Sequence, residues 1–230
     1  MIQIFEKLNV EFCIKKIIFE DFRKMEPKKL KVILIGCSGV GKTCLITRWN
    51  EDRFDPNNLS TIGAGITSII VSIDDVDYNL QVWDTAGQDS LREVTSLYFR
   101  DSLAAMVVFD VSNRESFSEI SSWIELLQSK TSGVPFMIVG NKFDLAQDNP
   151  DSNCVKLDEL SEKADHYSCS YFLTSAKTGY GVNECFQELA TLALSPRITP
   201  ESRGISNEPQ VVDISTRSQG NSNNNKSCCG

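Results

Sequence analysis

Residues 36–43 carry glycine, lysine and threonine at a spacing that suits phosphate binding. They read Gly-Cys-Ser-Gly-Val-Gly-Lys-Thr, follow an apolar run at 30–35 that is typical of a buried strand, and lead into a helical pattern. Glycines let successive backbone N–H groups turn toward an anion, and the helix N-terminus adds partial positive charge. Lys42 would then reach the β- and γ-phosphates, and the Thr43 hydroxyl would ligate Mg²⁺. The stretch therefore predicts a cradle for a nucleoside triphosphate.

A second motif, Asn141-Lys142-Phe143-Asp144, indicates which base is bound. It follows the apolar run 136–140, so it lies where a strand ends, at the edge where open α/β sheets bind ligands. A carboxylate at Asp144 can accept hydrogen bonds from the N1–H and 2-amino groups of guanine, a donor pair that adenine lacks. Leaving such a group unpaired can cost a factor of ~10⁴ in discrimination. Asn141 and Lys142 would brace the loop and cover the base. Without the phosphate loop, this motif would equally fit a plain turn.

Two further segments complete the predicted site. Asp84 ends a strand in Asp84-Thr85-Ala86-Gly87-Gln88 and is expected to hold Mg²⁺ through water. Gly87 leaves its N–H open to the γ-phosphate, and Gln88 is placed to orient the attacking water. Ser175-Ala176-Lys177 also follows a strand, and its backbone would contact the guanine carbonyl. By itself, that tripeptide would be an ordinary loop.

These motifs, in this order, resemble those of small GTPases of the Ras superfamily, and the Rab branch most of all, over residues 29–194. The resemblance implies that GTP or GDP is bound together with Mg²⁺. It implies that phosphate is bound by Ser38, Gly39, Val40, Gly41, Lys42, Thr43, Cys44, Thr61 and Gly87. It implies that guanine is bound by Phe54, Asn141, Lys142, Asp144, Ser175, Ala176 and Lys177. It implies metal ligands at Thr43, Thr61 and, through water, Asp84, with Gln88 and Lys42 as catalytic residues.

The Rab likeness is carried by residues 88–100, which resemble the switch II helix of that branch. The sequence after Thr61-Ile62-Gly63 departs from it, because Ala64-Gly65-Ile66 stands where Val-Asp-Phe is usual. Asp89 also replaces the usual glutamate. Rab effectors often contact an aromatic triad, of which this chain keeps Trp83 and Tyr98 but has Ile66.

Two functions remain open on these residues. Retained Gln88, Thr61 and Asp84 favour a slow GTP-hydrolysing switch in vesicle traffic. The altered neighbours favour a nucleotide-locked GTP-binding module with little turnover. A P-loop kinase that uses ATP is disfavoured by Asp144 and by the lack of a lid or acceptor site. For the switch, the family implies an exchange factor, a GTPase-activating protein, effectors and a prenyl-binding escort protein as partners.

Short apolar runs alternate with amphipathic stretches along the chain, which predicts an α/β fold. We predict strands at 31–35, 66–73, 79–83, 104–109, 136–139 and 171–174. We predict helices at 42–50, 91–99, 116–130, 156–165 and 182–194. The expected fold class is a doubly wound, mostly parallel six-stranded sheet with helices on both faces, the small G domain of P-loop NTPases. A hairpin at 66–83 would supply one antiparallel edge strand, as in the family.

Charge and cysteine content restrict the partners. The net charge is −8, from 23 basic and 31 acidic residues, which disfavours nucleic acid because a phosphate backbone needs a basic surface. Eight cysteines occur without C-x-x-C spacing, which favours a reduced, cytosolic compartment over a disulfide framework or a zinc site. The single histidine, His166, is interpreted as a surface helix residue.

Both ends differ from the central domain at 29–194. We interpret 1–28 as an N-terminal extension, either untranslated, with translation starting at Met25, or disordered; the alternative is an amphipathic segment that touches membrane or partner. Residues 195–230 are rich in Pro, Ser, Asn, Gln and Gly, which predicts a disordered tail. Cys228 and Cys229 near its end are the expected prenylation site, and an unmodified tail is the alternative. The protein would then lie on the cytoplasmic face of intracellular membranes and cycle with the cytosol.

Overall fold

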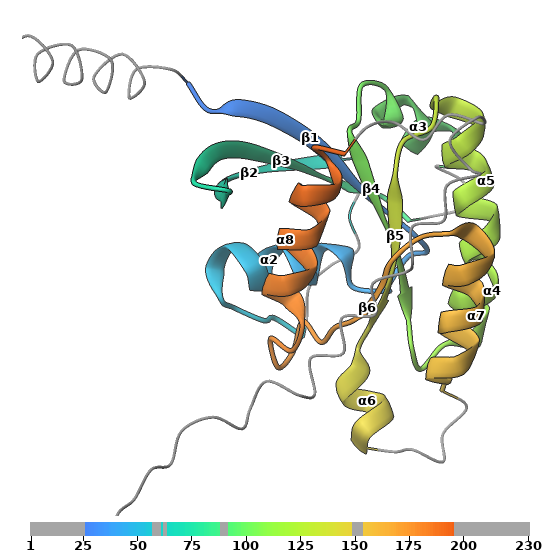
Figure 1. Cartoon of the computed structure of the whole chain (residues 1–230). Coiled ribbons are helices and arrows are strands. Elements are labelled where there is room, and N and C mark those ends of the chain that lie inside the picture. Colours follow the sequence, from blue (N-terminus) through green and yellow to red (C-terminus); the bar gives the residue numbers. More distant parts are fainter. Residues whose placement is uncertain (1–25, 57–60, 62–63, 88–91, 149–153, 196–230) are drawn as a thin grey trace, which may run out of the picture.

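A six-stranded sheet forms the centre of the protein. The computed structural model describes residues 26–56, 61, 64–87, 92–148 and 154–195. The strands are β1 (Lys28–Ile35), β2 (Ala64–Ile73), β3 (Val76–Thr85), β4 (Ala104–Asp110), β5 (Phe136–Asn141) and β6 (Tyr171–Leu173). They are ordered β2-β3-β1-β4-β5-β6 (Figure 1). Only the β2–β3 pair is antiparallel, so the predicted mostly parallel sheet with one antiparallel edge strand is confirmed.

Helices cover both faces of this sheet (Figure 1). The helices on one face are α2 (Lys42–Glu51) and α8 (Val182–Leu192). The helices on the other face include α5 (Ile120–Lys130) and α7 (Leu157–Tyr167). The shorter elements are α3 (Arg92–Ser96), the 3₁₀ helix η2 (Leu97–Phe99), α4 (Arg114–Ser118) and α6 (Phe143–Asp148). This arrangement confirms the doubly wound fold class.

The alternation of side chains along the strands explains why two cores form. In β1, Val32 and Leu34 pack in the core beneath α2 and α8, whereas Ile33 and Ile35 pack in the core beneath α5 and α7. Every residue of β4 and β5 is buried, as expected for central parallel strands covered on both faces. The edge strand β2 is different, because Ile66 and Ile70 are each more than half exposed.

Three helical segments differ from those predicted. The predicted helix 116–130 is two helices, and the first starts earlier because the Asn113 side chain caps it, accepting hydrogen bonds from the Glu115 and Ser116 N–H groups. The predicted helix 91–99 is α3 followed by η2, with Leu91 outside the described residues. The helix α6 was not predicted, because a segment of six residues is too short to show an apolar period.

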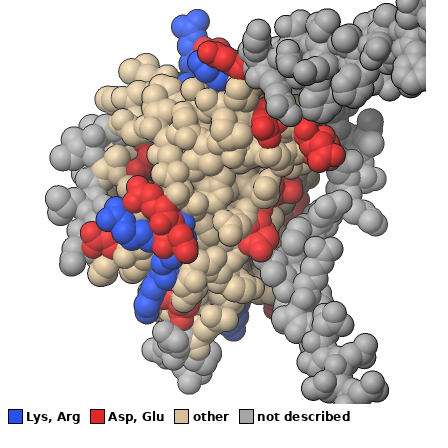
Figure 2. Space-filling model, turned by 90° about the vertical axis from the view of Figure 1, so that its left-hand side faces the viewer, with Lys and Arg blue, Asp and Glu red and all other residues tan. Residues whose placement is uncertain are grey.

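None of the helices in the described part of the chain is long and apolar enough to cross a bilayer. On the face seen in Figure 2, charged side chains form small groups around a broad uncharged area, without a continuous basic strip among the described residues.

Candidate nucleotide-binding site

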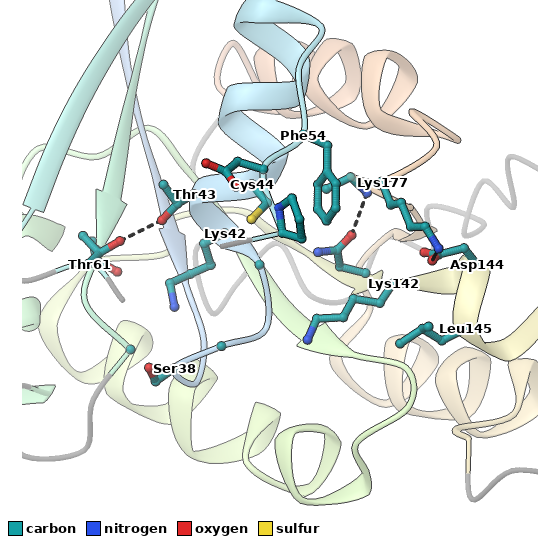
Figure 3. A pocket seen from close by; sticks show the side chains of 18 residues that line it. Ser38, Lys42, Thr43, Cys44, Phe54, Thr61, Lys142, Asp144, Leu145 and Lys177 are labelled. Carbon is teal, nitrogen blue, oxygen red and sulfur yellow. Dashed lines mark hydrogen bonds and ion pairs between the residues drawn. The ribbon is translucent and has the colours of Figure 1, made fainter. Parts of the chain in front are cut away.

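A cavity of about 320 Å³ opens where the strands reach their carboxyl ends. The loop after β1 forms one wall, the segment after β3 adds Gly87, and the residues after β5 and β6 form the far end. In Figure 3, Thr43 and Thr61 lie at one end of the cavity, and Asp144 with Lys177 lies at the other. One cavity is therefore lined by residues of both the predicted phosphate site and the predicted base site.

Two glycines of the phosphate loop have no substitute at their positions. Gly36 has φ of 138°, and a Cβ there would lie 2.1 Å from the Val108 carbonyl oxygen. Gly41 has φ of 96°, and a Cβ there would lie 2.4 Å from the Asn141 amide nitrogen. Both contacts are far inside van der Waals distance, and positive φ is strained for other residues. The loop consequently packs directly against β4 and Asn141.

Lys42 lies buried at the start of α2 with its ammonium over the loop. Its Nζ donates hydrogen bonds to the carbonyl oxygens of Gly36, at 2.7 Å, and Cys37, at 2.9 Å. Burial lowers the pKa of Lys42 to about 8, and the nearby Asp84 carboxylate opposes that shift only in part. A cation held here with incomplete compensation suits an anionic ligand.

Thr43, Thr61 and Asp84 form a compact set of oxygen atoms. The two hydroxyl oxygens are 2.7 Å apart, and Thr43 and Thr61 donate to Asp84 Oδ2 at 2.6 and 3.2 Å. Asp84 Oδ1 is buried and has no hydrogen-bond partner among the described residues, and burial raises the pKa of this carboxyl despite the Thr43 hydrogen bond. No group of three His, Cys, Asp or Glu side chains gathers within the described residues. Hard oxygen ligands with one unsatisfied carboxylate oxygen fit Mg²⁺.

Asp144 occupies the base end of the cavity, in the first turn of α6. It is buried, and its Oδ1 accepts a hydrogen bond from the Ser175 hydroxyl at 2.6 Å. The Lys177 ammonium lies 3.6 Å from its Oδ2. Ser175 and Lys177 therefore fix the orientation of the carboxylate. A fixed orientation is needed for a group that accepts hydrogen bonds from one particular base.

Asn141 ties the two ends of the site together. Its Nδ2 donates to the Val40 carbonyl oxygen at 2.9 Å, and its Oδ1 accepts from the Ala176 N–H at 3.2 Å. Asn141 therefore joins the phosphate loop to the base loop. The predicted site residues Val40, Asp84 and Ser175 are not among the residues that line the cavity.

Most of the residues predicted to form the site line this one cavity, and a few lie outside the described part of the chain. The cavity is lined by the predicted Ser38, Gly39, Gly41, Lys42, Thr43, Cys44, Phe54, Thr61, Gly87, Asn141, Lys142, Asp144, Ala176 and Lys177. Gln88, Cys228 and Cys229 lie outside the described residues.

Sequence reasoning missed Asp110, whose Oδ2 lies 2.7 Å from the Lys142 ammonium. Lys142 has φ of 63°, so its backbone lies in the left-handed region next to the predicted base site. The available signal was positional, because Asp110 ends the buried run of β4 at the same sheet edge. Asp55, Pro56, Thr85 and Leu145 also line the cavity without having been predicted.

Comparison with known proteins gives consistent matches. A model described as the Ras family matches residues 31–195. The Ras-like GTP-binding protein RYL2 of Yarrowia lipolytica is 33% identical over 210 residues, covering 89% of this chain and 100% of the relative. Ras-related protein Rab-26 of Bos taurus is 39% identical over 162 residues, covering 70% of this chain and 62% of the relative. Ras-related protein Rab-13 of Rattus norvegicus is 35% identical over 194 residues, covering 84% of this chain and 93% of the relative.

Proposed function

Because the chain belongs to the Ras family of small GTPases, we propose that it is a GDP/GTP switch that binds Mg²⁺ and hydrolyses GTP slowly. One observation carries the proposal. A single cavity has Lys42 and the phosphate loop at one end and the fixed Asp144 carboxylate at the other. A site with both kinds of group suits a guanine nucleotide whose phosphate chain lies along the loop.

The residues at the phosphate end support hydrolysis by positioning and charge. Backbone N–H groups of the loop and Lys42 stabilise charge that develops between the β- and γ-phosphates. Thr43, Thr61 and Asp84 would hold Mg²⁺, which when bound neutralises phosphate charge. Gln88 would orient the attacking water. No arginine occurs among the described residues that line the cavity, so an activating protein is expected to supply further positive charge.

The output of the switch would be the ordering of the segments that contain Thr61 and Gly87. Both residues face the cavity, where a γ-phosphate would hold them and a diphosphate would release them. A surface for effectors is available beside them. Trp83 and Tyr98 have ring centroids 5.7 Å apart, and Ile66, which is 55% exposed, pairs with Trp83 across the β2–β3 ladder.

The similarity to Rab proteins supports a role in vesicle traffic. Rab-26 and Rab-13 are named among the relatives, and the chain spans most of the length of Rab-13. We infer prenylation at Cys228 and Cys229, an exchange factor, a GTPase-activating protein, effectors and a prenyl-binding escort protein. The protein would act on the cytoplasmic face of intracellular membranes and return to the cytosol with its escort.

Nucleotide binding and single-turnover hydrolysis test this proposal. The native protein should bind GDP but not ADP, and Gln88→Leu should keep GTP binding while losing most phosphate release. Leucine retains the volume but lacks groups that orient water. Phosphate release is measured with and without a GTPase-activating protein. Equal rates for the native and Gln88→Leu proteins in both conditions would favour the nucleotide-locked binding module instead.

A further inference from the structure

The far end of α2 contacts the base loop through Arg48, from outside the cavity. Its Nε donates to the Ala176 carbonyl oxygen at 2.8 Å, and its Nη2 donates to the Lys177 carbonyl oxygen at 2.9 Å. The Arg48 side chain is only 16% exposed. Two charge-assisted hydrogen bonds to consecutive carbonyls fix the position of a loop that has no regular secondary structure.

The Arg48 guanidinium also binds Asp52, on the other chain segment beside the cavity. Its Nη1 donates to the backbone oxygen and to Oδ1 of Asp52, both at 2.8 Å. Asp52 is the C-terminal cap of α2, with φ of 48°, and starts the segment that brings Phe54 into the cavity. One side chain therefore joins the two chain segments that flank the base, which are more than 120 residues apart in sequence.

The contacts of Arg48 with Asp52 and with the base loop should differ in how much they stabilise the site. The Asp52 carboxylate is 94% exposed, so its ion pair with Arg48 is screened by water and contributes little. The hydrogen bond to the Ala176 carbonyl oxygen is partly buried, whereas the one to the Lys177 carbonyl oxygen is exposed, and a planar, forked donor reaches both. Of the contacts that Arg48 makes, the partly buried one to Ala176 should therefore contribute most to the position of the base loop, where it adds to the hydrogen bond from the Ala176 N–H to Asn141.

We propose that Arg48 is a positioning residue that holds the base loop at 175–177 and thereby sets the lifetime of the bound nucleotide. This inference rests on the proposed guanine-nucleotide function. Because α2 begins with Lys42 and Thr43, the helix that carries the phosphate and metal ligands also fixes the base loop. Loosening Arg48 should weaken the base end alone, and both GDP and GTP should leave faster by a similar factor.

Release of a fluorescent GDP analogue from the full-length protein tests the assignment. Arg48→Ala should release it about tenfold faster, which corresponds to ~1.4 kcal/mol of binding free energy. Arg48→Lys keeps the positive charge but lacks the forked guanidinium, so its release rate should lie between those of the native protein and Arg48→Ala. Acceleration of release by a Mg²⁺ chelator should be as large as in the native protein, because Thr43 is untouched. The hydrolysis rate should change far less than the release rate.

Arg114 offers a matched control, because it joins the Cys154 carbonyl oxygen to the Glu159 carboxylate away from the cavity. Arg114→Ala should leave release unchanged. Native-like release from Arg48→Ala would overturn the positioning role and leave the proposed function standing. Equal acceleration by Arg114→Ala, or by Asp52→Asn, would also overturn it. Failure of the native protein to bind GDP would instead overturn the proposed function.

Discussion

At the scale of single residues, the charge of Lys42 should depend on what fills the cavity. Burial holds its pKa at about 8, and bound phosphates should raise that pKa because they favour the ammonium form. Near pH 8 about half of the nucleotide-free protein carries neutral Lys42, so GDP binding should take up roughly half a proton. Affinity should fall as the pH rises above 8.

Calorimetry in two buffers of different ionisation enthalpy measures this uptake. A metal chelator is present, so that no ion contributes, and the pH range of 8 to 9 lies above the phosphate pKa of about 6. Binding without proton uptake at pH 8, with an affinity that is flat up to pH 9, would contradict the assigned environment of Lys42.

Asp144 should determine base selectivity. Asp144→Asn replaces an acceptor oxygen with a donor, so GDP should bind roughly 10- to 100-fold more weakly, the range for losing a charge-assisted hydrogen bond. Xanthosine diphosphate, which has a carbonyl in place of the amino group, should bind better than to the native protein. Asp165→Asn, on the exposed side of α7, is the control and should change neither affinity. Tight ADP binding by the native protein would refute the base site.

Candidate site residues could be predicted where their position in the sequence fixes their position in the fold. Lys42, Asp84 and Asn141 each lie at a set distance from a strand end, and parallel strands end at a common edge. Arg48 could not be found in this way, because its partner Ala176 becomes a neighbour only after the chain has folded. Asp110 does end a strand at this edge, but its ion pair with Lys142 could not be read from the sequence.

At the scale of elements, α8 is held on the sheet by an aromatic stack with α2. The Trp49 and Phe186 rings are 4.2 Å apart and nearly parallel, and Phe186 is fully buried. Phe186→Ala should lower the free energy of unfolding by ~3–5 kcal/mol, because it removes the stack and leaves a cavity. Denaturant unfolding measures this loss, and Gln187→Ala, on the exposed side of the same helix, should cost far less. Equal losses would mean that α8 is not anchored through this ring.

The elements that the sequence predicted are those with strong apolar periods. Strands β4 and β5 are buried throughout and read as continuous apolar runs, while α5, α7 and α8 each bury one apolar face. The break between α4 and α5 at Glu119, and the short helix α6, depend on local capping and loop contacts. The spacing of apolar residues cannot predict features that depend on local hydrogen bonds.

At the scale of the whole molecule, the charge of the sequence bears on how the protein could attach to a membrane. The net charge is −8, and residues 195–230 carry four basic and three acidic side chains. Each basic residue near an anionic leaflet contributes only ~1 kcal/mol, and the acidic residues offset most of that. Electrostatics therefore favours a lipid anchor as the source of attachment.

We expect replacement of both Cys228 and Cys229 by serine to move the protein from membranes to cytosol without changing GDP binding. Each buried methylene contributes ~0.8 kcal/mol, so one chain binds reversibly and two anchor stably. Single replacements should consequently give weak or misdirected attachment. Sedimentation of tagged full-length protein from cells measures the distribution, and Cys154→Ser, within the domain, serves as the thiol control. If the double-serine protein still sediments with membranes, the anchor lies elsewhere, and the Ile- and Phe-rich segment 1–24 is the next to remove.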